Sequence, residues 1–66
     1  MHYNPLKQYR ENHDLSQQEL ADRLGCSRQM VSHLERGDRD FTLDMALKIE
    51  KELGINRIVI IPKLAA

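Results

Sequence analysis

Four residues of this chain carry the thiol and imidazole groups that bind zinc and take part in nucleophilic catalysis. They are Cys26, His2, His13 and His33, and their positions match no spacing typical of a metal site. No acidic residue stands where it would orient one of them for catalysis, and 66 residues leave little room for a substrate pocket. We therefore expect no enzyme, metal, cofactor or small-molecule substrate. We interpret Cys26 as a small turn residue in preference to a redox switch.

Hydrogen-bonding side chains are concentrated in the segment SRQMVSHLERG, residues 27–37. Met30, Val31 and Leu34 recur there at helical spacing and form one apolar stripe. The remaining face carries polar residues, and they are Arg28, Gln29, Ser32 and His33. Such a face is either a solvated helix surface or a surface that binds a partner.

Four helices are expected to position this face, because each can be located from its end residues. The residues that can cap their N-termini are Asn4, Ser16, Ser27 and Thr42. Three of the helices stop at glycines, which are Gly25, Gly37 and Gly54. The pattern predicts helices over about 5–12, 16–24, 27–36 and 43–53. The fourth carries the apolar residues Leu43, Ala46, Leu47, Ile49 and Leu53.

The tail, residues 55–62, has a different character. It is rich in β-branched residues, lacks helical spacing and ends at Pro62, so we expect a short strand. Its alternating residues Ile58, Val59, Ile60 and Ile61 would make both faces apolar. The strand would either fold back on its own core or pair with the same strand of a second subunit. We expect the second arrangement, which makes these four residues a dimer interface.

Composition places the chain among ordinary globular domains, with 41% hydrophobic and 30% charged residues. It opens with no basic and apolar leader, and its longest apolar run is far shorter than a membrane span. We expect a single domain over residues 1–66 in the cytoplasm, with no membrane partner. The formal net charge is zero and the pI is about 6.8, so no general attraction to nucleic acid follows from charge.

Residues 16–37 have the general form of two short helices joined by a tight turn at Gly25. The stretch QQELADRLG, followed by SRQMVSHLERG and TLDMALKIEKELGI, resembles the DNA-binding domains of the lambdoid repressor and Cro (XRE-like) family. In this arrangement Ala21 allows the helices to cross closely, and Val31 and Leu34 hold the crossing. The resemblance covers about residues 4–55. It implies an all-α domain of four to five helices, to which the expected C-terminal strand would be added.

The resemblance also implies double-stranded DNA as partner, with the third helix in the major groove and the second helix's N-terminus at phosphate. Arg28 can then pair with guanine and Gln29 with adenine, while Ser32 and His33 lie within reach of a base or the backbone. The residues expected at phosphates are Ser16, Gln17, Ser27, Arg36 and Arg39.

A structural ion pair between Arg10 and Glu35 is implied by the same resemblance, and we expect it to be largely buried and to orient the third helix. If it neutralises Glu35, the helix surface becomes locally positive through Arg28 and Arg36. The next turn carries Asp38 and Asp40, where family members often have basic residues. We therefore expect few phosphate contacts and a shallow salt dependence.

These observations predict a homodimeric transcriptional regulator of the repressor or Cro type on a palindromic operator. An antitoxin, which would bind a toxin protein in addition to DNA, is the first alternative. The second is an interaction adaptor that has the same fold and no DNA binding.

Overall fold

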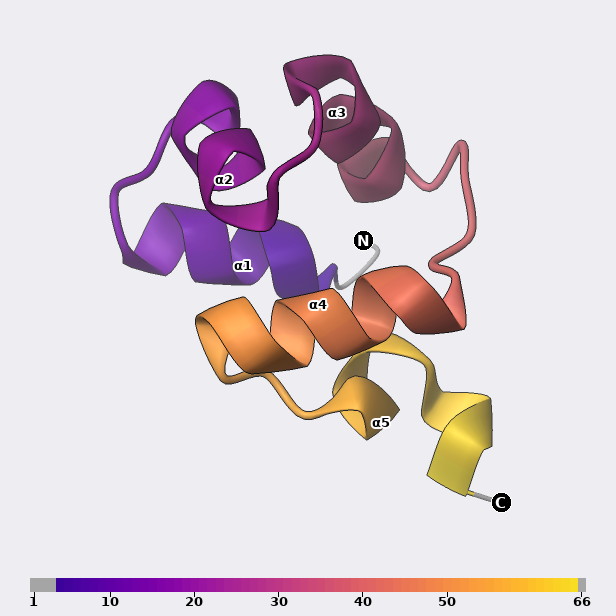
Figure 1. Cartoon of the computed structure of the whole chain (residues 1–66). Coiled ribbons are helices and arrows are strands. Elements are labelled where there is room, and N and C mark those ends of the chain that lie inside the picture. Colours follow the sequence, from indigo (N-terminus) through magenta and orange to yellow (C-terminus); the bar gives the residue numbers. More distant parts are fainter. Residues whose placement is uncertain (1–3, 66) are drawn as a thin grey trace.

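The computed structural model describes residues 4–65, so His2 lies outside it. The described chain forms five α-helices and a final 3-10 turn (Figure 1). They are α1 (Pro5–Asn12), α2 (Gln17–Leu24), α3 (Arg28–Arg36), α4 (Leu43–Leu53), α5 (Arg57–Ile60) and η1 (Pro62–Ala65). The prediction of an all-α architecture is confirmed, and the first four helices agree with their predicted ranges.

Side-chain caps explain why these four helices begin where they do. In each, the capping oxygen accepts a hydrogen bond from the backbone N–H three residues later, at 2.9–3.2 Å. The capping residues are Asn4, Ser16, Ser27 and Thr42. Ser16 also donates its backbone N–H to the Glu19 carboxylate at 2.8 Å, which completes the capping box.

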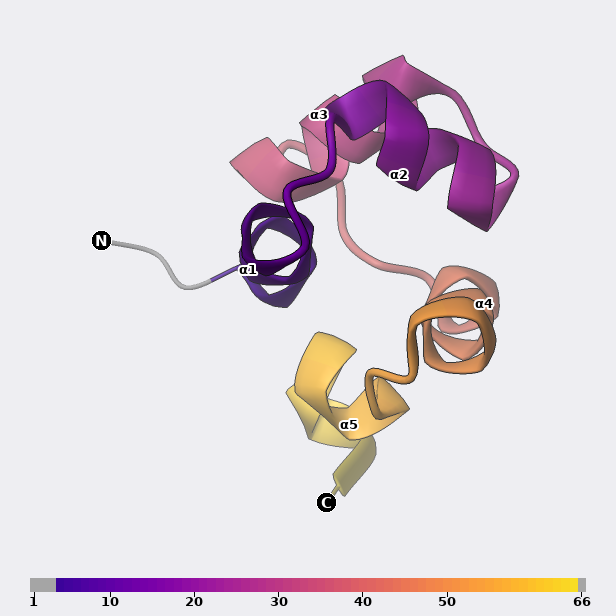
Figure 2. The same ribbon diagram turned by 90° about the vertical axis from the view of Figure 1, so that its left-hand side faces the viewer.

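The core lies between the helices and takes residues from all five. Figure 2 shows α2 and α3 together at one end of the molecule and α4 and α5 at the other. The buried side chains are Leu6, Leu20, Ala21, Leu24, Val31, Leu34, Ala46, Ile49 and Ile60. The second and third helices supply five of these nine residues.

The prediction of a C-terminal strand is wrong, because the tail forms α5. The Asn56 side chain accepts from the Ile58 amide at 2.9 Å, and the Glu50 carboxylate accepts from the Arg57 amide at 2.8 Å. These bonds satisfy donors at the start of a helical turn, which outweighs the strand preference of β-branched residues. The expected pairing of tail strands across a dimer is lost with the strand.

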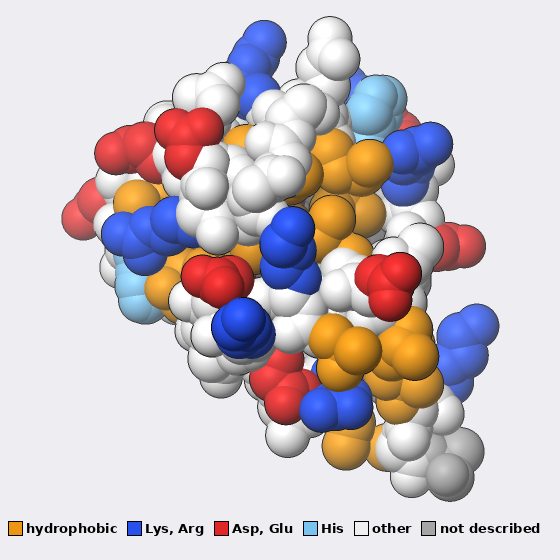
Figure 3. Space-filling view, viewed as in Figure 1, with side chains coloured by type: hydrophobic (Ala, Val, Ile, Leu, Met, Phe, Trp, Pro, Cys, Tyr) orange, Lys and Arg blue, Asp and Glu red, His pale blue; other side chains and the backbone are white. Residues whose placement is uncertain are grey.

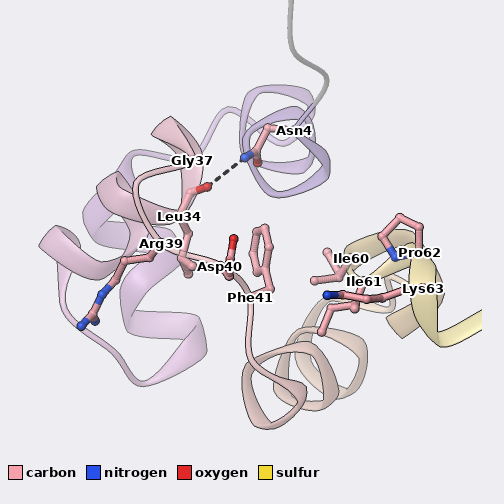
Figure 4. Close-up of a pocket in the computed structure, with 10 residues that line it drawn as sticks. All are labelled: Asn4, Leu34, Gly37, Arg39, Asp40, Phe41, Ile60, Ile61, Pro62 and Lys63. Carbon is pink, nitrogen blue, oxygen red and sulfur yellow. Dashed lines mark hydrogen bonds between the residues drawn. The ribbon is translucent and has the colours of Figure 1, made fainter.

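The tail instead folds back on its own core. Ile60 is buried and Ile61 is half-buried, and Figure 4 shows both side chains directed toward Phe41 of the α3–α4 connection. A cleft of about 320 Å³ lies between these residues and the end of α3. Of the four residues expected at a dimer interface, two thus pack against the core of their own subunit.

The other two, Ile58 and Val59, are exposed and belong to an apolar patch. The members of this patch are 37–50% exposed, and they are Leu43, Leu47, Ile58, Val59 and Leu64. Figure 3 shows hydrophobic side chains gathered over α4 and the C-terminal segment. Leu43 and Leu47 were expected among the apolar residues of the fourth helix, but only Ala46 and Ile49 of that set are buried. Among residues 4–65, no helix has the length and apolar character needed to cross a bilayer.

Candidate nucleic-acid interface

The turn between α2 and α3 is built by Gly25 and Cys26. Gly25 has φ +68°, a left-handed conformation that favours glycine, and the Cys26 amide donates to the Ala21 carbonyl at 3.0 Å. Cys26 is half-buried against the core, and burial raises the pKa of its thiol. The turn therefore uses Cys26 as a small apolar residue, and its thiol stays protonated near neutral pH.

This turn sets the crossing of α2 over α3 and decides which face of α3 is outward. Ala21 and Val31 are fully buried and Leu34 is 3% exposed. Their burial fixes one side of α3 against the core, because a close-packed interior leaves little freedom to rotate the helix. The opposite side of α3 faces outward.

Five polar side chains of α3 line one hollow on this outward side, with a volume of about 310 Å³. They are Arg28, Gln29, Ser32, His33 and Arg36. Arg28, Gln29 and Arg36 are exposed, while Ser32 and His33 are half-buried. All four side chains expected at bases thus share one surface with one of the residues expected at phosphates.

An internal ion pair joins α1 to the far end of α3. Arg10 donates from Nε to Glu35 Oε2 at 2.8 Å and from Nη2 to Oε1 at 3.0 Å, and it also donates to the Leu15 carbonyl. The Arg10 side chain is 18% exposed and that of Glu35 is 4% exposed. The bond to Glu35 raises the pKa of Arg10, so its guanidinium stays protonated within the domain.

The Gln17 side chain hydrogen-bonds to this ion pair, whereas it was expected to contact a DNA phosphate. Its Nε2 donates to Glu35 Oε1 at 3.2 Å, so the side-chain amide is directed into the domain. Sequence reasoning missed this contact because Gln17 and Glu35 are brought together only by the crossing of α2 and α3.

The remaining phosphate candidates lie at two helix N-termini and in the α3–α4 connection. Ser16 and Ser27 are exposed at the N-termini of α2 and α3, and each hydroxyl accepts a cap bond while its own proton remains free to donate. Arg39 is exposed in the α3–α4 connection, with Nη1 3.6 Å from the Met30 sulfur. None of these three residues lines the hollow on α3.

The C-terminal end of the outward face carries a cluster of three charged or titratable side chains. Arg36 Nε lies 3.1 Å from Asp38 Oδ2, and His33 Nδ1 lies 3.2 Å from Arg36 Nη2 and 3.4 Å from Asp38 Oδ2. A neutral His33 can accept from Arg36 or donate to Asp38 through Nδ1, but one tautomer cannot do both. Because the Arg36 guanidinium can only donate, its contact with His33 is a hydrogen bond in the tautomer whose Nδ1 carries no proton.

The family of this chain follows from comparison of its sequence with known proteins. A family model described as helix-turn-helix matches residues 6–59. The chain belongs to the helix-turn-helix family. The resemblance drawn from residues 4–55 is thereby confirmed, and α2 and α3 are the two helices of the motif.

Relatives of this helix-turn-helix protein are found among archaeal proteins. An uncharacterized HTH-type transcriptional regulator of Methanocaldococcus jannaschii is 46% identical over 52 residues, which make up 79% of each chain. An uncharacterized HTH-type transcriptional regulator of Methanothermobacter thermautotrophicus is 36% identical over 53 residues, or 80% of this chain and 77% of the relative. A much longer relative from Pyrococcus abyssi is 46% identical over 46 residues, only 15% of its length. No solved structure matches the chain.

One contact that fixes the helix-turn-helix unit was not found from the sequence. Asn4 caps α1 through Oδ1, and its Nδ2 donates to the carbonyls of Leu34 at 2.9 Å and Glu35 at 3.3 Å (Figure 4 draws the Leu34 bond). Its cap role was predicted from the sequence, but its second role depends on a residue 30 positions away. Asn4 therefore ties α1 to the last turn of α3.

Proposed function

We propose that this protein is a transcriptional regulator that binds double-stranded DNA with α3 in the major groove. The observation that carries the proposal is the hollow on the outward side of α3, lined by five hydrogen-bonding side chains. Family membership and the names of the relatives support it independently. A major groove admits one α-helix, and hydrogen-bonding groups on base edges there distinguish all four base pairs.

Arg28 and Gln29 are assigned to base reading because they stand at the first turn of α3. The Arg28 guanidinium has the two parallel donors that match guanine, and the Gln29 amide has the donor and acceptor that match adenine. Both are exposed, and Arg28 forms no ion pair within residues 4–65. Ser32 and His33 lie one turn further on and are assigned to an adjacent base or the sugar-phosphate wall.

Ser16, Ser27, Arg36 and Arg39 are assigned to phosphates on either side of the groove. The N-termini of α2 and α3 add unpaired backbone donors and the positive ends of two helix dipoles. Gln17 contributes through its backbone amide, since its side chain is bound to Glu35. These contacts position the protein, whereas sequence preference comes from the first turn of α3.

The functional unit in this proposal is a homodimer on a palindromic operator. Its interface is the exposed apolar patch on α4, α5 and η1, rather than a pair of strands. A 66-residue domain has a small core, and covering five apolar side chains with a second copy adds buried area. A two-fold dimer would place two α3 helices about 34 Å apart, one turn of DNA.

Selection of binding sites from a pool of random duplex DNA tests the proposal. We expect enrichment of two inverted half-sites whose centres are about ten base pairs apart. A variant with Arg28→Glu and Gln29→Glu should enrich no sequence while keeping its helical circular dichroism spectrum. If the unmodified protein enriches no sequence, the proposed function is wrong and the adaptor interpretation replaces it.

A further inference from the structure

Asp38 stands two residues beyond α3, yet its side chain lies against the last turn of that helix. Gly37 has φ +81°, and the amides of Gly37 and Asp38 both donate to the His33 carbonyl, for Asp38 at 3.1 Å. This helix end reverses the chain and returns the Asp38 carboxylate to Arg36 and His33. The position of the carboxylate is therefore built by the backbone.

This arrangement engages one of the two cationic residues assigned to phosphates. Arg36 donates toward Asp38 from Nε, and its Nη2 lies 3.2 Å from His33 Nδ1, so the carboxylate already occupies one side of the guanidinium in the free protein. A phosphate that approached Arg36 from the hollow would compete with the carboxylate for the same donors. It would also meet the negative charge of Asp38 at close range.

We propose that Asp38 is a positioning residue that holds Arg36 back from DNA phosphate and so lowers the affinity for DNA of any sequence. The inference rests on the proposed function, because it concerns the same surface. When DNA binds, Arg36 must give up its contact with Asp38 to contact a phosphate. Arg36 therefore contributes less to the free energy of DNA binding than an unpaired arginine would. Base reading by Arg28 and Gln29 is unaffected, since Asp38 bonds to neither of them.

The neighbouring Asp40 supplies a matched control. It lies in the same connection, is exposed as Asp38 is, and forms no ion pair within residues 4–65. Asp40→Asn and Asp38→Asn remove the same net charge, but only the second releases an arginine. The difference between them separates the specific contact from a general loss of repulsion.

The experiment measures fluorescence anisotropy with a labelled duplex of random sequence, at several salt concentrations. We expect Asp38→Asn to tighten binding about five- to tenfold at low salt and to steepen the log-log salt slope by about 0.9 for each subunit. Asp40→Asn should change affinity less than twofold and leave the slope unchanged. In an Arg36→Gln background, Asp38→Asn should gain no more than Asp40→Asn does.

The outcomes distinguish this inference from the function on which it rests. Equal gains from the two asparagine variants, or a full gain from Asp38→Asn without Arg36, would overturn the role of Asp38 while leaving DNA binding intact. Absence of binding by the unmodified protein and by Asp38→Asn alike would reject both. Circular dichroism melting of each variant checks that the fold is retained.

Discussion

Glu35 is the residue on which the internal polar contacts of α3 converge. It accepts from Arg10 and from Gln17, and Asn4 donates to its backbone carbonyl. Since its side chain is 4% exposed, loss of its cationic partner would leave a carboxylate with little access to water. The pair therefore matters more for the placement of α3 than an exposed ion pair would.

Replacing Arg10 with Met should lower the free energy of unfolding by roughly 3–5 kcal/mol. The reason is the stranded Glu35 carboxylate, which would keep only the Gln17 side chain as a partner. Thermal and urea denaturation followed by circular dichroism measure the loss, with Arg23→Met on the exposed surface of α2 as the control. An Arg10→Met melting curve that matches the unmodified protein would contradict this role.

Sequence and resemblance located Arg10, Glu35 and the outward residues of α3, because these positions follow from helical spacing and from a known motif. The second partners of Asn4 and Gln17 could not be located in this way. Both depend on how helices cross in space, and the residues they join are 30 and 18 positions apart. The roles of residues within single helices could thus be predicted, whereas contacts between helices could not.

At the scale of elements, local chemistry predicted the helices well and failed in the tail. Caps mark the starts of α1 to α4 in the sequence and terminal glycines mark the ends of α2 to α4, and each is a short-range signal. The residues of α5 favour a strand by type, but Asn56 and Glu50 satisfy the donors of a helical turn. Glu50 is seven positions from Arg57, beyond the reach of a capping pattern.

Two carboxylates that act at helix starts make stability depend on pH. Hydrogen bonds from Ser16 lower the pKa of Glu19, and those from Arg57 lower the pKa of Glu50, relative to an ordinary value of 4.5. Their stabilisation is therefore complete above that ordinary value. It is lost as the pH falls from there through the lowered pKa values, because the unfolded chain takes up protons first.

We expect the melting temperature to fall as pH is lowered from 6 to below about 4, and Glu50→Gln to make this fall smaller. The variant should also melt lower than the unmodified protein at pH 6, since it lacks the charged contact with Arg57. Circular dichroism melts across this pH range provide the measurement, with exposed Glu52→Gln as the matched control. An identical fall in the Glu50→Gln variant and the unmodified protein would rule out the contribution of Glu50.

At the scale of the whole molecule, the positions of the charged residues explain how a protein with zero net charge can present a positive surface to DNA. Glu35 is neutralised inside the domain by Arg10, and Arg28 is exposed on the outward face. In the free protein Asp38 forms an ion pair with Arg36, so Arg36 adds little to the positive charge of the outward face. Affinity in this account depends on a local surface, and salt dependence should be shallow.

The apolar patch determines the oligomeric state in this account. Val59→Lys should shift the protein from dimer to monomer in sedimentation equilibrium at tens of micromolar and weaken binding to a two-half-site duplex at least tenfold, because it places a charge in the interface. Gln8→Lys, on the exposed surface of α1, adds the same charge outside the patch and should leave the dimer unchanged. A monomeric unmodified protein that still protects both half-sites would contradict the proposed interface.

The central claim is that the first turn of α3 reads bases, and a base-preference profile of Arg28→Ala tests it most directly. On the selected duplex and its single-base variants, we expect the unmodified protein to discriminate at one guanine position of each half-site by about 1–3 kcal/mol. Arg28→Ala should lose that discrimination, and its affinity should fall more for the selected duplex than for random duplex, whereas Lys51→Ala on α4 should behave as the unmodified protein does. An unchanged profile in Arg28→Ala would contradict the account.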